Sequence, residues 1–150
     1  MIINDPATVA EVTERFDAYE RALRENDLTT LDGFFWDSPH ALRYGVGENL
    51  VGIDMIRAFR KGRVGGSPPR TLHNTVITTW GSDFATTNTE FRRANTSSTG
   101  RQTQVWVRMP EGWRIATLLR DVDQQWGHKL ESKGIDFDTI IRQQKEGTQS

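Results

Sequence analysis

Apolar side chains in the first part of the chain recur at helical spacing, and this pattern predicts three helices. The first helix is expected to begin at Asp5 and Pro6, because Asp caps free backbone amides and Pro suits a first helical turn. Its apolar residues are three or four positions apart and form one stripe: Val9, Val12, Phe16, Tyr19 and Leu23. A short second helix is expected over residues 28–35, and a third after Gly52 with Ile53, Ile56 and Phe59 on one side.

From Arg70 onward the apolar period changes to two, which predicts extended strands rather than helices. Turn residues such as Gly81 and Ser82 separate the extended segments and suit hairpin connections. An earlier short strand is expected at residues 41–45, followed by a turn at 46–49. The four later strands are predicted at residues 72–80, 84–93, 101–109 and 113–119.

This order of elements predicts an α+β fold in which three N-terminal helices pack on a curved antiparallel sheet. One domain is expected over residues 1–120. Residues 121–150 are expected to form a divergent C-terminal extension rather than a separate domain, with Asp136 capping a last helix that carries Phe137, Ile140 and Ile141. A strongly curved sheet closed by helices makes a cone with a blind cavity, which is a usual place for a ligand.

The composition narrows the classes of function. Acidic and basic residues number 20 and 19, they are evenly mixed, and the net charge is −1, so the sequence gives no reason to expect nucleic acid or a membrane surface as a partner. The absence of cysteine excludes a disulfide framework, thiolate catalysis and thiolate metal ligands. The N-terminal residues lack the pattern of a signal peptide, and no apolar run approaches the ~20 residues that span a bilayer, so a cytoplasmic protein is expected.

The sequence carries no motif for a metal or a cofactor. Neither a P-loop nor a dinucleotide fingerprint is present. The histidines lie far apart and form no ligand pattern at helical spacing: His40, His73 and His128. We therefore expect no metal site and no cofactor.

Two residues stand out as groups that bind or react with a polar ligand. Tyr19 lies on the apolar stripe of the first helix, so its ring is expected to point inward, where a phenol needs a hydrogen-bond partner. Arg43 lies in the short first strand beside Gly-rich turns, and its planar guanidinium matches a carboxylate with two hydrogen bonds. Each residue also has a structural interpretation: a core tyrosine bonded to a backbone carbonyl, and an arginine paired with Glu48 or another acid of the fold.

The predicted strands bring further polar residues to one face of the sheet. Gln102 and Gln104 point the same way on one strand, with Trp106 beyond them. Two amides on one face suit the carbonyl and N–H groups of a polar ligand, and a solvated strand face is the alternative. Arg70 and Asn74 also share one face of their strand with Leu72 and are expected to reach the same ligand. These five residues form the predicted substrate-binding set.

Several motifs resemble those of one protein family. They cover roughly residues 3–116, and the combination of Arg-Tyr-Gly-Val-Gly-Glu with Gly-Arg-Gln-x-Gln is specific. By these motifs the chain resembles the AtzH-like proteins, also called oxalurate catabolism proteins, of the nuclear-transport-factor-2-like (SnoaL-like) superfamily. The segments that carry the resemblance are residues 35–40, 43–50, 56–60, 83–86, 100–104 and 106–115.

The resemblance implies a cone-shaped fold and a role in ureide and cyanuric acid breakdown. The reaction that it implies is conversion of 1,3-dicarboxyurea to allophanate, a decarboxylating amidase step on a small anionic metabolite. Tyr19 and Arg43 fall on the catalytic pair implied by the family. By analogy with the superfamily a homodimer is expected, and the family's gene context implies an amidase as a further partner.

The chain departs from the family pattern at the end of the last strand. Ala116 is followed by Thr117-Leu118-Leu119-Arg120 in place of an Ala-His-x-Ser-like ending, so the polar groups that this strand contributes differ. Two other functions stay open: a non-catalytic anion-binding or assembly subunit of an amidase complex, and an isomerase or dehydratase of the same fold. The isomerase requires a buried Asp or a pair of His residues in the pocket, and the sequence does not place one.

Overall fold

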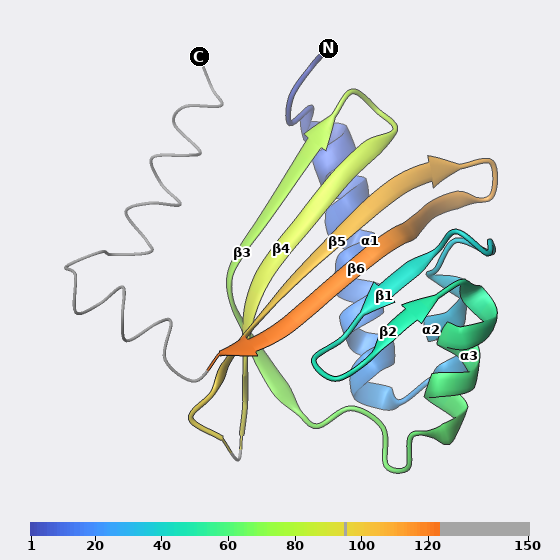
Figure 1. Ribbon diagram of the computed structural model, residues 1–150. Coiled ribbons are helices and arrows are strands. Elements are labelled where there is room, and N and C mark those ends of the chain that lie inside the picture. Colours follow the sequence, from blue (N-terminus) through green and yellow to red (C-terminus); the bar gives the residue numbers. More distant parts are fainter. Residues whose placement is uncertain (95, 124–150) are drawn as a thin grey trace.

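The computed structural model describes residues 1–94 and 96–123, and within these ranges the chain forms three helices and six strands (Figure 1). The helices are α1 (Pro6–Glu25), α2 (Leu28–Gly33) and α3 (Ile53–Gly62). The strands are β1 (Leu42–Tyr44), β2 (Asn49–Val51), β3 (Arg70–Trp80), β4 (Phe84–Arg93), β5 (Thr99–Met109) and β6 (Gly112–Asp123). This order confirms the predicted α+β class, and the last helix expected from Asp136 lies outside the described residues.

The six strands form one curved sheet in the order β2-β1-β6-β5-β4-β3, with the helices packed on one face (Figure 1). Strands β3 to β6 form the predicted antiparallel meander. Strand β1 pairs with β2 as a hairpin but runs parallel to β6, so the sheet is mixed at this point rather than antiparallel throughout. Side chains on the helix-covered face therefore form the interior of the domain.

Helix α1 begins at the cap that its sequence predicts and ends at Asn26. The side chain of Asp5 accepts a hydrogen bond from the backbone N–H of Thr8 at 3.1 Å, and Asn26 ends the helix in the left-handed conformation with φ of 52°. One face of the helix is buried, and Tyr19 and Glu20 lie on it. The helix therefore carries both an apolar stripe and two polar groups toward the sheet.

Strand β6 continues past its expected end at Leu119. Arg120 is buried opposite Gln102, and Asp121 forms an exposed ion pair with Arg101 on the other side of the same strand pair. These polar contacts extend the strand through a sequence that hydrophobicity alone does not mark as extended.

The hydrophobic core lies between α1 and the sheet. It is built largely from aromatic side chains, which bury much area per residue. Its largest fully buried members are Trp106, Tyr19, Phe35 and Phe91. None of the helices in the described ranges is long and apolar enough to cross a membrane.

Candidate functional site

Four buried arginines from four different elements converge on the phenol of Tyr19. Arg43 lies in β1, Arg60 in α3, Arg70 in β3 and Arg120 in β6, and the side chain of each is at most 7% exposed. The charge of each one lowers the pKa of Tyr19, so all four act electrostatically on its hydroxyl. We call these four residues the arginine cluster. A buried arginine is rare unless it is paired, so the cluster needs an explanation beyond packing.

Tyr19 is fully buried, and its hydroxyl has no hydrogen-bond partner among the residues that the structure describes. Its ring packs edge-to-face against Phe34, with the ring centroids 5.6 Å apart. Burial raises the pKa of Tyr19, but the charges of the arginine cluster outweigh burial and hold the pKa below the ordinary value of a phenol. The alternative of a hydroxyl bonded to a backbone carbonyl is not formed within the described residues. The hydroxyl is therefore a buried hydrogen-bond donor under the influence of several positive charges.

Arg43 donates from Nη1 to Oε1 of Glu48 at 2.6 Å, and its guanidinium lies 5.1 Å from the centre of the Phe59 ring. The β1–β2 turn brings Glu48 back toward the strand, because the N–H of Gly45 donates to its carbonyl at 2.8 Å. A Cβ atom at position 45 would lie 1.8 Å from Oε1, so this ion pair requires glycine there. The ion pair between Arg43 and Glu48, which the sequence analysis gave as the structural alternative, is therefore formed. Nε of Arg43 has no partner in the described ranges.

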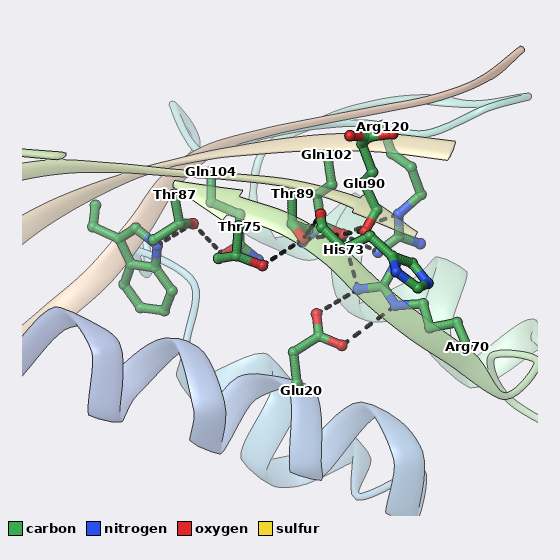
Figure 2. A network of polar contacts seen from close by, with 11 residues as sticks. Glu20, Arg70, His73, Thr75, Thr87, Thr89, Glu90, Gln102, Gln104 and Arg120 are labelled. Atoms are coloured by element: carbon green, nitrogen blue, oxygen red, sulfur yellow. Dashed lines mark hydrogen bonds and ion pairs between the residues drawn. The ribbon is translucent and has the colours of Figure 1, made fainter. Parts of the chain in front are cut away.

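A network of hydrogen bonds joins α1, β3, β5 and β6 (Figure 2). Arg70 pairs with Glu20, with Nε donating to Oε2 at 3.3 Å and Nη2 donating to Oε1. Oε1 of Gln102 accepts from Nη2 of Arg70 at 3.2 Å and from Nε and Nη2 of Arg120 at 3.2 and 2.8 Å. Because the amide oxygen faces two arginines, the amide nitrogen of Gln102 faces elsewhere, and it has no acceptor in the described part of the chain.

The ring of Phe91 supports two members of the arginine cluster. The guanidinium of Arg70 lies 4.6 Å from the ring centre and that of Arg120 lies 5.7 Å from it, within the range of cation–π attraction. The ring occupies the place of a side chain at Gly100, its partner on β5, where a Cβ would lie 2.1 Å from the ring. The glycine of the Gly-Arg-Gln motif thus makes room for the aromatic ring that positions both arginines.

Gln104 is oriented by a second chain of hydrogen bonds. The indole N–H of Trp106 donates to the hydroxyl of Thr87 at 3.1 Å, and that hydroxyl donates to Oε1 of Gln104 at 2.9 Å. The indole uses the hydroxyl of Thr87 as an acceptor, and the single hydrogen of that hydroxyl points to Gln104, so the amide oxygen of Gln104 faces Thr87. Nε2 of Gln104 then has no acceptor among the described residues. Trp106 is fully buried against Phe34, so its place is in the core, where it orients Gln104.

Asn74 does not share the face of Arg70, contrary to the expectation from strand alternation. It lies at a β-bulge, where the register with β4 shifts between His73 and Val76, and its φ of 53° is left-handed. A bulge inserts one residue and changes the direction of the side chains that follow. Asn74 therefore donates from Nδ2 to Oε2 of Glu90 at 2.5 Å, whereas Arg70 reaches the carboxylate on α1.

The atoms of Tyr19, the arginine cluster, Gln102 and Gln104 that are buried and lack hydrogen-bond partners in the described residues are all donors. They are Tyr19 Oη, Arg43 Nε, Arg60 Nε and Nη2, Arg70 Nη1, Gln102 Nε2 and Gln104 Nε2. An acceptor, Asp32 Oδ1, also lacks a hydrogen bond and lies 3.3 Å from Arg60 Nε. A buried donor without an acceptor is costly, and buried polar groups in native proteins are nearly always satisfied. A small molecule rich in acceptor oxygens, such as a carboxylate, supplies what these groups lack. These donors and the charges of the arginine cluster together form the candidate site.

Three residues of the candidate site were missed by the sequence analysis: Glu20, Arg60 and Arg120. Arg60 lies 3.3 Å from Asp32 through Nε and Oδ1, and its guanidinium is 5.2 Å from the centre of the Phe35 ring. The signal that identifies these residues is a charged side chain at a position where the apolar pattern of its helix or strand predicts a buried one. Each follows a buried apolar residue at the period of its own element: Glu20 four after Phe16, Arg60 four after Ile56, and Arg120 two after Leu118.

The curved sheet and the helices on one of its faces form a nuclear-transport-factor-2-like fold. A nuclear-transport-factor-2-like protein of unknown function from Pseudomonas putida KT2440 shares this fold, with a TM-score of 0.67, 14% sequence identity, and coverage of 78% of this chain and 87% of that chain. At this level of identity the likeness concerns the fold alone.

Within this class, the sequence model of the AtzH-like family matches residues 1–121, and the chain belongs to that family. A protein of unknown function from Pectobacterium atrosepticum SCRI1043, of the DUF3225 family, is 48% identical, with a TM-score of 0.79 and coverage of 81% of this chain and 94% of that chain. A cystatin-like fold protein from Burkholderia xenovorans LB400 is 44% identical, with a TM-score of 0.78 and coverage of 81% and 96%. No match was found among curated proteins. Family and fold together support a protein that binds a small molecule.

Proposed function

We propose that this protein converts 1,3-dicarboxyurea, or a similar N-carboxylated urea, to allophanate in a decarboxylating amidase-type reaction of cyanuric acid and ureide catabolism. The observation that carries the proposal is the set of buried donors without acceptors around Tyr19. A dicarboxylated urea offers two carboxylates and a central carbonyl. These are several acceptors, and two of them are negatively charged, as the unpartnered donors and the arginines require. Membership of the AtzH-like family supports the same substrate class.

The charges of the site favour a dianion over a neutral ligand. The four buried guanidinium groups face one fully buried carboxylate, that of Glu20, while Glu48 and Asp32 remain partly exposed with side chains 25% and 21% accessible. Attraction between charges is stronger away from water, so each guanidinium binds a carboxylate more tightly than it would at the surface. The site therefore keeps an excess of positive charge that an anionic ligand reduces.

The proposed chemistry requires one proton. An N-carboxylate loses carbon dioxide when the bond between its carbon and nitrogen breaks, and the electron pair of that bond passes to the nitrogen. The hydroxyl of Tyr19 donates a proton to this nitrogen as general acid, and water later returns a proton to the phenolate. The products are allophanate and carbon dioxide, with one proton consumed from solvent.

The arginine cluster assists the step in two ways. Arg43 holds a carboxylate of the substrate and stabilises charge as it moves, which is electrostatic preorganisation. The neighbouring guanidinium groups lower the pKa of Tyr19, so the phenol gives up its proton more readily than an ordinary tyrosine. The amides of Gln102 and Gln104 then supply N–H donors for the central carbonyl.

The test supplies dicarboxyurea from an upstream amidase and follows allophanate formation by the full chain, after subtraction of the non-enzymatic rate. Tyr19→Phe removes the general acid and is expected to lower the rate by about 10²–10⁴-fold. Arg43→Gln removes charge stabilisation and is expected to cost about 10²–10³-fold.

Two matched variants serve as controls. Tyr44→Phe alters the other tyrosine, which is 37% exposed, and Arg92→Gln removes an exposed charge from β4. Both are expected to keep the wild-type rate. Full activity of both Tyr19→Phe and Arg43→Gln, with the fold intact by circular dichroism, contradicts the proposed mechanism.

A further inference from the structure

Within the described residues, Arg120 is the member of the arginine cluster without a carboxylate partner. Its hydrogen bonds there go to the neutral amide oxygen of Gln102. The other three members each lie against an acid, in the pairs Arg43–Glu48, Arg60–Asp32 and Arg70–Glu20. Arg120 therefore contributes a buried positive charge that the described part of the protein does not neutralise directly.

The acceptor that Arg120 uses is shared with a second cation. Oε1 of Gln102 takes hydrogen bonds from Arg120 and from Arg70, so two guanidinium groups are held next to one another by a single neutral oxygen (Figure 2). Burial lowers the pKa of Arg120 to about 9, with the charges of Arg70 and Arg43 acting in the same direction, and the group stays protonated at neutral pH. Such an arrangement costs free energy in the absence of an anion.

Arg120 and Arg43 lie on the same face of two neighbouring strands. Arg43 is in register with Leu118 across the parallel β1–β6 pair, and all three side chains are buried. Arg120 is two residues beyond Leu118, which is about 7 Å along the strand, and the strands are about 5 Å apart. The ring of Phe91 covers one side of the Arg120 guanidinium. Nε and Nη2 donate to Gln102, so a ligand would approach the edge that carries Nη1.

We propose that Arg120 binds the second carboxylate of a dicarboxylate ligand whose first carboxylate lies on Arg43, and that Arg120 sets the specificity of the site for dicarboxylates over monocarboxylates. Gln102 holds Arg120 in position for this contact. The inference rests on the proposed function only in taking a doubly charged small molecule as the ligand.

The test measures binding by calorimetry with two probes that are not turned over, malonate and acetate, and uses the full chain. The wild type is expected to bind malonate about 10- to 100-fold more tightly than acetate, which is the contribution of one charge-assisted pair. Arg120→Met is expected to bind malonate no more tightly than acetate. Its melting temperature without ligand is expected to equal or exceed that of the wild type, because Arg70 still satisfies the oxygen of Gln102 and a buried charge has been removed.

The control is Arg92→Gln, which removes one exposed positive charge from β4 and is expected to keep the preference for malonate. If Arg120→Met does not fold, Arg120→Lys is used in its place. This variant keeps the charge but not the planar guanidinium, so malonate binding is expected to weaken at least fivefold and acetate binding to stay unchanged. A wild type that does not prefer malonate, or a folded Arg120 variant that keeps the full preference, overturns the proposal.

The outcomes separate this inference from the proposed function. Loss of the malonate preference in Arg120→Met, in a protein that does not convert dicarboxyurea, supports the dicarboxylate site and removes the proposed reaction. Conversion of dicarboxyurea by Arg120→Met with an unchanged KM supports the reaction and overturns the role of Arg120.

Discussion

Glu48 holds the guanidinium of Arg43 across the β1–β2 turn, with 2.6 Å between Oε1 and Nη1, and the turn has room for this contact because position 45 is glycine. The side chain of Arg43 is 4% exposed and that of Glu48 is 25% exposed, so the carboxylate bridges the buried site and the solvent. The Arg-Tyr-Gly-Val-Gly-Glu motif is thereby explained as a device that positions one arginine.

Glu48→Gln is expected to destabilise the fold by about 1–3 kcal/mol, because it leaves the buried Arg43 with a neutral partner in place of a charged one. The measurement is the midpoint of urea unfolding. The matched control is Asp121→Asn, which breaks the Arg101–Asp121 pair, whose side chains are about half exposed, and is expected to cost less than about 1 kcal/mol. Equal losses in the two variants argue against a special role for Glu48.

The lowered pKa of Tyr19 predicts a pH dependence of the reaction. The general acid must be protonated, so kcat/KM is expected to fall as the pH rises through the pKa of Tyr19, which lies below the ordinary phenol value of ~10. Arg60 has the largest charge effect on this group. Arg60→Gln is therefore expected to raise the pKa and to move the alkaline fall of the rate to higher pH.

The same pKa is measurable without turnover. The chain has two tyrosines, so in Tyr44→Phe the near-ultraviolet absorbance of phenolate reports Tyr19 alone. Its titration is expected to shift upward when Arg60→Gln is added, and to stay in place when Arg92→Gln is added. If the pKa of Tyr19 does not change in Arg60→Gln, the charge of Arg60 does not act on Tyr19 and the expected pH profile is wrong.

The helices and strands were largely predictable because each has a clear apolar period and local turn or cap residues. The cap of α1 at Asp5 and the strand over residues 84–93 follow from such local signals. Arg120 was not predicted to belong to a strand, since only its contact with Gln102 across β5 and β6 makes this polar segment regular. That contact joins residues 18 positions apart, and no local pattern reveals it.

Part of the candidate site was also predictable from local periodicity. Tyr19 and the inward face of β5 follow from periodicity, which the structure confirms by burial of Gln102 and Gln104. Alternation fails at Asn74, because a bulge changes side-chain direction without a marker in the apolar pattern. Glu20, Arg60 and Arg120 were missed because a charged residue at a buried position was not considered part of the site. Such a residue indicates a buried hydrogen-bond network.

The bulge leads to a prediction at Asn74, whose φ of 53° suits glycine as well as asparagine. Asn74→Gly is expected to keep the rate of allophanate formation within about twofold, because the side chain contacts Glu90 rather than the arginine cluster. Asn74→Val is expected to lose about 1–2 kcal/mol of stability, since a β-branched residue is disfavoured in the left-handed region. A large loss of rate in a stable Asn74→Gly protein restores Asn74 as a substrate-binding residue.

The contact between Gly100 and Phe91 predicts that a single methyl group disturbs two arginines. In Gly100→Ala the new Cβ would lie 2.1 Å from the ring of Phe91, so the ring must move, and overpacking of this kind costs about 1–3 kcal/mol. Because the ring supports Arg70 and Arg120, malonate binding is expected to weaken together with stability in urea.

A matched glycine and a compensating change test this explanation. Gly62→Ala, at the end of α3, meets no atom within 4 Å and is expected to leave stability unchanged or raise it by up to about 1 kcal/mol. In the double variant Gly100→Ala with Phe91→Leu the smaller side chain frees the space, so the two changes are expected to cost less than the sum of their separate effects. Malonate binding should stay weak in that double variant, since the aromatic face is gone. Strict additivity of the two stability losses shows that the methyl group and the ring do not compete for the same space.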